Sequence, residues 1–137
     1  QSPTMASEQV HLISRWPLRR GLTPELEEAL VALAQAVHEH EPDTLSYAVY
    51  VGAFAVDIPP TAGASGGRLP DDQQQAVTFE EVFLDPSAFE RHLDGEAFTR
   101  FRTTYLDHFY EDPTKQGWPA ATTTFLSRLA ATHRRDD

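Results

Sequence analysis

The sequence has no cysteine among its 137 residues. This absence excludes disulfides, thiolate nucleophiles and zinc sites with thiolate ligands. A chain without cysteine fits a reducing compartment, so we expect a cytoplasmic protein. No apolar run is long enough to span a bilayer, and no charged-then-apolar segment opens the chain. We therefore expect neither membrane insertion nor export.

Basic residues are also scarce, because 11 Lys and Arg stand against 21 Asp and Glu, for a net charge of -10. The two arginine pairs, at residues 19–20 and 134–135, are too short to follow a phosphate backbone, which excludes nucleic acid as a partner. The glycines of residues 63–67 lead into Arg68 and Pro70 rather than into a helix start. A phosphate-binding loop is therefore missing, and we expect no nucleotide or flavin cofactor.

At this length, and with 40% hydrophobic residues, the chain fits one globular domain with a core. We expect residues 10–131 to form it and residues 132–137 to be a C-terminal tail. Residues 1–9 are expected to be disordered or, ahead of Met5, an added leader before the native start.

Alternation of apolar side chains is the main pattern in the middle of the chain. Residues 44–54 alternate in this way and predict a strand, and its second face is also largely apolar, which indicates a strand covered on both sides. Residues 76–84 predict the next strand. Residues 57–75, rich in proline and glycine, predict a long hairpin loop between the two.

Two helices begin with a capping residue followed by proline, at residues 23–24 and 85–86. The first ends at Pro42, and its apolar stripe at helical spacing is Leu26, Leu30, Leu33 and Val37. The second carries His92 on its inward arc, and Gly95 separates it from a third helix.

Residues 10–18 predict a first strand and residues 121–131 a fourth, although the second half of the latter would also accept a helix. The order strand–helix–strand–strand–helix–strand predicts an α+β, ferredoxin-like split βαβ fold with an antiparallel sheet. Any chemistry is expected between the sheet and its helices.

Two segments resemble the antibiotic biosynthesis monooxygenase (ABM) domain family. EPDTLSYAVY is similar to its "E-P-G-t-l-x-Y" segment, with Asp43 where glycine is usual, and FEEVFLDPSAFERHL is similar to its "f-v-E-x-Y-x-D-x-x-A-x-x-x-H-l" segment. The residues that match the second segment are Glu81, Phe83, Asp85, Phe89 and His92. The likeness covers roughly residues 10–101.

The resemblance implies a homodimeric α+β barrel, in which two sheets pack face to face and cover the second strand on both sides. It also implies a cofactor-independent monooxygenase that oxidises a phenolic, quinol or anthrone-type aromatic substrate with O2, in natural-product biosynthesis. The family also includes haem-degrading enzymes that use an Asn, Trp and His set. The absence of asparagine from this chain argues against that branch.

His92 is the candidate base, because an imidazole can exchange a proton near neutral pH. The alternative is a buried histidine held by a backbone carbonyl or by a side chain of the sheet. Tyr47 occupies the family's tyrosine position and is the second catalytic candidate, as a hydroxyl donor, although core packing is the commoner role. Tyr50 lies on the opposite face of the strand, and we count it among the substrate-binding candidates.

Four further residues are candidates for binding the substrate. Trp16 and Trp118 can stack on a flat aromatic ligand or simply fill a core and a loop. His40 can reach the second strand or contact the last carbonyls of its helix, and Phe89 stands at an apolar position of the family segment. We expect no metal site, because His38 and His40 are two residues apart on a helix and do not face each other.

Three functions stay open from the residues alone. The first is the cofactor-free oxygenase. The second is a non-oxidative cyclase or isomerase that uses His92 as acid and base, and the third is a non-catalytic ligand-binding dimer. A pocket that contains His92 and one tyrosine would favour the first two, and oxygen consumption would separate them.

Overall fold

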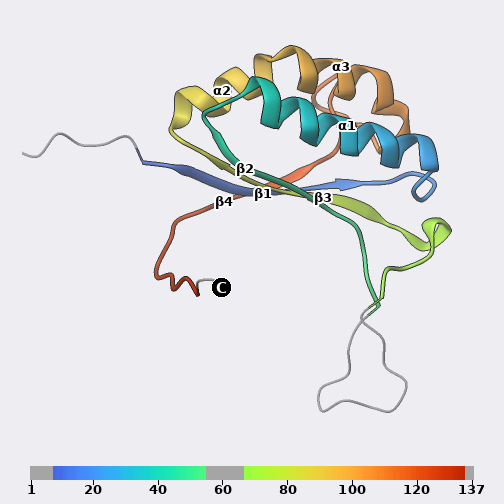
Figure 1. Cartoon of the computed structure of the whole chain (residues 1–137). Coiled ribbons are helices and arrows are strands. Elements are labelled where there is room, and N and C mark those ends of the chain that lie inside the picture. The colour runs from blue at the N-terminus through green and yellow to red at the C-terminus, as the bar shows by residue number, and fades with distance from the viewer. Residues whose placement is uncertain (1–7, 55–66, 135–137) are drawn as a thin grey trace, which may run out of the picture.

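The computed structural model describes residues 8–54 and 67–134, and it shows three helices on one face of a four-stranded antiparallel sheet (Figure 1). The elements, in chain order, are β1 (Val10–Pro17), α1 (Pro24–His40), β2 (Thr44–Tyr50), β3 (Ala76–Phe83), α2 (Pro86–Asp94), α3 (Glu96–Tyr105) and β4 (Thr122–Leu126). The strand order β2-β3-β1-β4 confirms the predicted ferredoxin-like α+β fold.

The helix boundaries follow from their capping residues. The Thr23 hydroxyl accepts a hydrogen bond from the Leu26 amide at 3.1 Å, and the Asp85 carboxylate accepts one from the Ala88 amide at 2.8 Å. α1 ends at His40, and the N–H of the next residue, Glu41, still bonds to the Val37 carbonyl; Pro42 cannot continue the helix.

The core between the layers is aromatic around Trp16. Its ring contacts Phe79 and Phe109 at centroid distances of 5.0 and 5.2 Å. The buried indole N–H donates to the Ser14 hydroxyl at 3.0 Å, so the polar end of this side chain has a partner inside the sheet. The predicted stripe of α1 is buried against this cluster.

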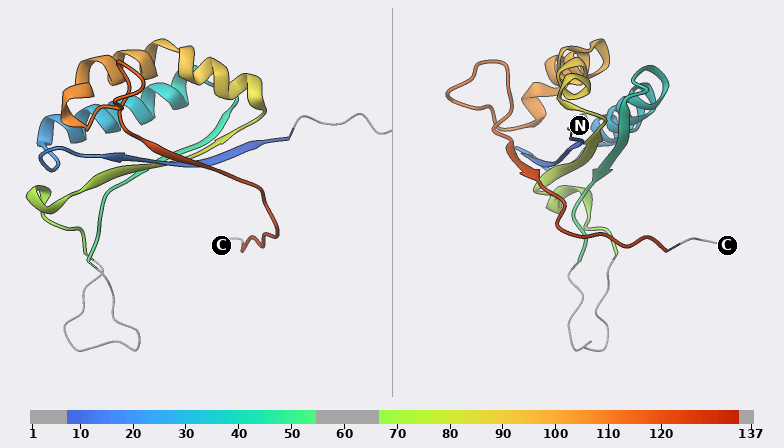
Figure 2. Two further views of the ribbon diagram at one scale, coloured as in Figure 1. Left: turned by 180° about the vertical axis from the view of Figure 1, so that it is seen from behind. Right: turned by 90° about the vertical axis from the view of Figure 1, so that its left-hand side faces the viewer.

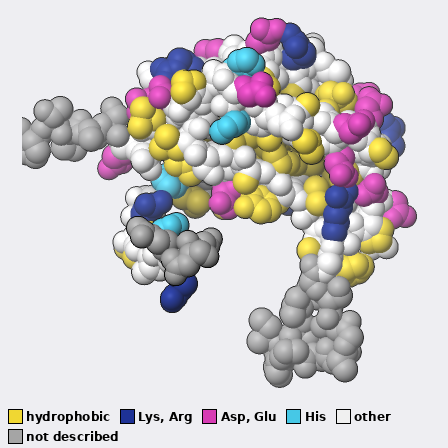
Figure 3. All heavy atoms as spheres, in the orientation of Figure 1, with side chains coloured by type: hydrophobic (Ala, Val, Ile, Leu, Met, Phe, Trp, Pro, Cys, Tyr) yellow, Lys and Arg dark blue, Asp and Glu magenta, His cyan; other side chains and the backbone are white. Residues whose placement is uncertain are grey.

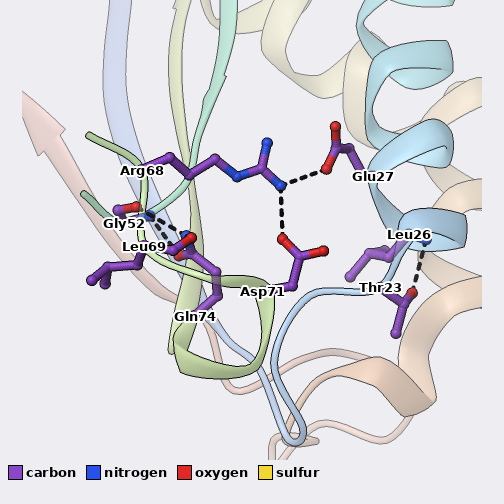
Figure 4. Close-up of polar contacts among 8 residues, drawn as sticks. All are labelled: Thr23, Leu26, Glu27, Gly52, Arg68, Leu69, Asp71 and Gln74. Atoms are coloured by element: carbon purple, nitrogen blue, oxygen red, sulfur yellow. Dashed lines mark hydrogen bonds and ion pairs between the residues drawn. The ribbon is translucent and has the colours of Figure 1, made fainter. Parts of the chain in front are cut away.

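β2 ends at Tyr50, four residues before the predicted end at residue 54. The reason is that the side chain of Gln74 forms hydrogen bonds with the backbone of Gly52. Its Oε1 accepts from the Gly52 amide at 2.6 Å, and its Nε2 donates to the Gly52 carbonyl at 2.9 Å (Figure 4). Beyond Tyr50 the backbone pairs with residues 67–69 instead of β3: the Leu69 N–H donates to the Gly52 carbonyl at 3.0 Å, and Ala53 forms a bridge with Arg68.

An ion-paired arginine joins the segment before β3 to α1. Arg68 contacts Glu27 at 2.5 Å and Asp71 at 3.0 Å (Figure 4). Much of the predicted loop, like residues 1–7 of the predicted N-terminal segment, lies outside the described residues.

The fourth strand is shorter than predicted, because only Thr122–Leu126 pair with β1 of the same chain and residues 127–134 are exposed and irregular. That segment lies on the side of the sheet away from the helices (Figure 2). Among the described residues, no helix covers this side, so the helices cover β2 on one face only. Within the described ranges, no helix has the length and apolar character needed to cross a lipid bilayer.

Candidate active site

His92 points from α2 into the space between the layers, where only 1% of its surface is exposed. Aromatic rings surround the imidazole, with centroids 5.1 Å away for Tyr47, 5.3 Å for Phe83 and 5.0 Å for Phe98. A polar ring buried in this way must find polar partners, because an unsatisfied buried nitrogen costs free energy.

A carboxylate faces each nitrogen of the buried imidazole. Nδ1 lies 2.8 Å from Oε1 of Glu41, a hydrogen-bond distance, and Nε2 lies 3.9 Å from Oε1 of Glu81. Nε2 has no hydrogen-bond partner among the described residues. An ionised carboxylate can only accept, so Nδ1 donates to Glu41 and the ring presents Nε2 to Glu81.

Several contacts hold Glu41 in place. Its Oε1 also accepts from the Thr44 hydroxyl at 3.0 Å, and its backbone N–H caps α1. The nearby Gly95 allows the close turn between α2 and α3, since a Cβ at that position would lie 3.0 Å from the Arg91 carbonyl oxygen. The carboxylate therefore fixes the end of α1, the start of β2 and the imidazole together.

Burial changes the protonation of the groups beneath His92. Desolvation raises the pKa of Glu81 from 4.5 to about 7; the nearby imidazole opposes this and the charge of Glu41 adds to it. Burial, with the charges of Glu81 and Glu41, raises the pKa of Tyr47 well above 10. Tyr47 is therefore a neutral hydroxyl, and its Oη has no partner among the residues described.

A groove of about 710 Å3 lies between α1 and the α2–α3 pair. These helices run in opposite directions (Figure 1), so Ala29 and Ala32 face Phe101 and Tyr105 at one end, and Glu41 lies at the other. The polar lining at the Glu41 end includes His40, Asp43, Thr44, Arg91 and His92, and the ion-paired Glu96 and Arg100 of α3 also line the groove. The groove is thus apolar at one end and polar at the other.

The place of the groove differs from the expected position between sheet and helices. Aromatic rings fill the space around His92 between the layers, so the groove opens between the helices instead. Acidic side chains are spread over the side of the molecule seen in Figure 3. Glu41, with 17% of its side chain exposed, both lines the groove and contacts the buried imidazole.

The family model described as "Antibiotic biosynthesis monooxygenase" matches residues 9–104. The chain belongs to this family. One solved structure of similar fold is SnoaB, a cofactor-independent oxygenase from Streptomyces nogalater, with 14% identity, a TM-score of 0.54, and coverage of 91% of this chain and 97% of that chain. PA3566 from Pseudomonas aeruginosa is 23% identical, with a TM-score of 0.60 and coverage of 91% of this chain and 98% of that chain. Rv0793 from Mycobacterium tuberculosis is 18% identical, with a TM-score of 0.52 and coverage of 92% of this chain and 100% of that chain. At these identities the likeness shows the fold alone. A search of curated proteins found no match.

In this ABM family member the two predicted catalytic residues, His92 and Tyr47, lie in contact. Of the predicted substrate-binding residues only His40 lines the groove, at its exposed rim. Trp16 is buried in the core, and Tyr50 is half exposed on the open face of the sheet.

Phe89 and Trp118 also lie outside the groove. Phe89 packs on Phe83, and Trp118 packs on Phe98 from its loop, with the charged ends of Arg102 and Lys115 over its ring. Stacking of a ligand on either tryptophan stays a prediction.

Sequence reasoning missed the two carboxylates beside His92. Glu41 served only as the end of a helix and Glu81 only as a match to the family segment. A signal for Glu81 was present, because it alternates with Val77, Phe79 and Phe83 on the buried face of β3. A charged residue at an apolar position of a strand indicates a buried polar site. Within residues 8–54 and 67–134, no group of three or more His, Asp or Glu could hold a metal ion.

The raised pKa of Glu81 predicts a pH dependence of stability. Between pH 4.5 and 7 the folded chain keeps a proton that the unfolded chain has lost, so the free energy of unfolding falls as pH rises through this window. The fall attributable to Glu81 is about 3 kcal/mol. Urea unfolding of wild type and Glu81→Gln across this range measures it, because the substitution removes the titration.

The matched control is Glu80→Gln, since Glu80 is the next residue of β3 and is exposed. Its curve should follow that of the wild type. Parallel curves for wild type and Glu81→Gln would contradict the raised pKa.

Proposed function

We propose that this protein is a cofactor-independent monooxygenase that oxidises a phenolic, quinol or anthrone-type aromatic substrate with O2, in natural-product biosynthesis. The observation that carries the proposal is the buried imidazole of His92, joined through Glu41 to the polar end of an apolar groove. Membership of the family supports it, as does the likeness in fold to SnoaB.

Such a reaction needs a substrate that reduces oxygen once it has lost a proton. For an anthrone, the ring CH2 gives a proton to the enzyme, and the resulting anion passes electrons to O2 and forms a carbon–peroxide bond. The peroxide regains a proton and loses water, which leaves a quinone carbonyl. One oxygen atom enters the product and the other leaves as water. The protein supplies a proton acceptor, a proton donor and a site shielded from solvent.

The groove fits the two ends of such a substrate. The alanines of α1 face Phe101 and Tyr105, so an aromatic body has apolar walls along the groove. The oxygen-bearing end would lie at Glu41, with His40 at the rim. We assign His92 as the acid–base centre. Tyr47, a neutral hydroxyl against the His92 ring, does not line the groove and supports the imidazole from inside.

The same acid–base centre would serve a non-oxidative cyclase or isomerase, and a ligand-binding dimer would need only the groove. Fold alone does not separate these functions. Oxygen consumption separates the first from the others.

Oxygen uptake with a panel of anthrones and hydroquinones, in the presence of a metal chelator, tests the proposal. The wild type should consume oxygen, and His92→Ala should lower kcat by about 100-fold or more, because the acid–base centre is lost. His38→Ala is the matched control, since His38 lies on the exposed side of α1. Uptake that His92→Ala leaves unchanged would refute the role of His92. No uptake by the wild type on the whole panel would favour the non-oxidative enzyme or the ligand-binding dimer.

We also propose that the open face of the sheet packs against a second copy of the chain. The strand registers place the apolar residues Ile13, Ala48, Tyr50 and Val82 on the face opposite the buried residues, together with polar residues such as Thr78 and Glu80. Apolar side chains left open to water on a sheet face cost free energy, and two such faces can cover each other. This packing is the homodimer that the family resemblance implies.

Light scattering should give twice the chain mass of 15.3 kDa. Val82→Lys should shift the mass toward that of one chain, because each copy would bury an unpaired lysine in the contact between the sheets. Val31→Lys is the matched control, since Val31 is an exposed valine of α1, away from the sheet, and this variant should keep the mass of the dimer. A wild type with the mass of one chain would refute the dimer.

A further inference from the structure

Glu41, His92 and Glu81 form a continuous row from the groove to the interior of the protein. Their side chains are 17%, 1% and 8% exposed, and only Glu41 and His92 line the groove. The row spans the C-terminal end of α1, α2 and β3, so one imidazole joins a carboxylate at the surface to a carboxylate in the core.

We propose that Glu41, His92 and Glu81 are a proton relay, in which Glu41 takes the proton from the substrate in the groove and Glu81 stores it and returns it. The proposal rests on the proposed function for the identity of the substrate. It adds two residues to the proposed mechanism: Glu41, which contacts the substrate, and Glu81, which stores the proton in the core.

The transfer balances with one proton. In the empty state Glu81 is ionised and accepts from Nε2–H of a neutral imidazole, and the Glu41 carboxylate is turned away from Nδ1, because an ionised carboxylate and a ring lone pair repel each other. The substrate proton moves to the Glu41 carboxylate and on to Nδ1, while the Nε2 proton passes to Glu81. In the filled state Glu81 is neutral, Nδ1–H donates to an ionised Glu41, and the imidazole is again neutral. The reverse sequence gives the proton back.

The Nδ1–Glu41 contact of the structure is the one that the filled state requires. The Nδ1–Glu41 contact of 2.8 Å is already a hydrogen bond, and Nε2 is free of partners among the described residues. The Nε2–Glu81 distance of 3.9 Å must shorten by about 1 Å for transfer, which is within the range of side-chain rotation.

The surroundings of Glu81 allow both states near neutral pH. The titratable groups that face it are His92 from α2, Glu41 from the end of α1 and Tyr47 from β2, and its neighbour in β1 is the apolar Leu12. Burial and the Glu41 charge raise its pKa to about 7, against the opposing effect of the imidazole. Tyr47 stays neutral, so it does not compete for the stored proton.

A buried store matches the proton count of the proposed oxidation. The reaction removes one proton before oxygen reacts and needs one back at the peroxide. A carboxylate that bulk water does not reach can hold that proton between the two steps. A base open to solvent would exchange this proton with water.

Binding of 2-naphthol under nitrogen at pH 8 tests the relay without oxygen chemistry, because the absorption band of naphtholate reports proton removal from the bound phenol. At this pH the store is mostly empty. The wild type should bind 2-naphthol as naphtholate without releasing a proton to the medium, measured with a pH indicator. Glu81→Gln and Glu41→Gln should reduce the naphtholate fraction by about tenfold or more, because each breaks the row.

The matched controls are Glu80→Gln and Glu39→Gln, each an exposed neighbour in the sequence of one relay carboxylate. Both should keep the wild-type naphtholate fraction. An unchanged fraction in Glu81→Gln, proton release by the wild type, or wild-type binding without naphtholate would each overturn the relay.

A folding defect in Glu81→Gln would be recognised from its circular dichroism spectrum. The 13C carboxyl resonance of Glu81 in the wild type then decides: it should move to the protonated position when 2-naphthol binds, and a resonance that does not move overturns the relay. A protein that ionises 2-naphthol through Glu81 but consumes no oxygen with any anthrone or hydroquinone would keep the relay and refute the oxygenase.

Discussion

The hydrogen bond between Nδ1 of His92 and the carboxylate of Glu41 is the contact on which the site depends. Both groups lose hydration when the helices close on the sheet, and a buried polar pair is stable only when its partners are well placed. Glu41 meets this requirement because its backbone N–H bonds to the end of α1 and its carboxylate accepts from Thr44 at the start of β2. Loss of Glu41 would leave a buried imidazole without its acceptor.

This contact also explains why the site has two sides. Nδ1 faces Glu41 and the groove, and Nε2 faces Glu81 and the sheet. The groove supplies apolar walls and a polar end, and the core supplies a carboxylate whose pKa is raised to about 7. A histidine held in this way can pass a proton between two environments that otherwise do not meet.

Much of the fold could be predicted from local chemistry. Capping residues before proline located α1 and α2, alternation located the strands, and the arc of α2 placed His92 inward. The end of β2 could not be predicted, because it depends on a bond from Gln74, 22 residues away in the chain. The pairing of His92 with Glu41 spans 51 residues, and it depends on the register of β2 and β3 and on how α1 packs against α2. Neither pattern nor propensity contains that information.

The position of the proton on the His92 ring tests the account most directly. 15N NMR of the imidazole measures it in the protein without ligand. His92→Ala identifies the resonances by their loss. At pH 6 the account predicts a proton on Nδ1, because Nδ1 donates to Glu41. A proton on Nε2 alone would contradict it.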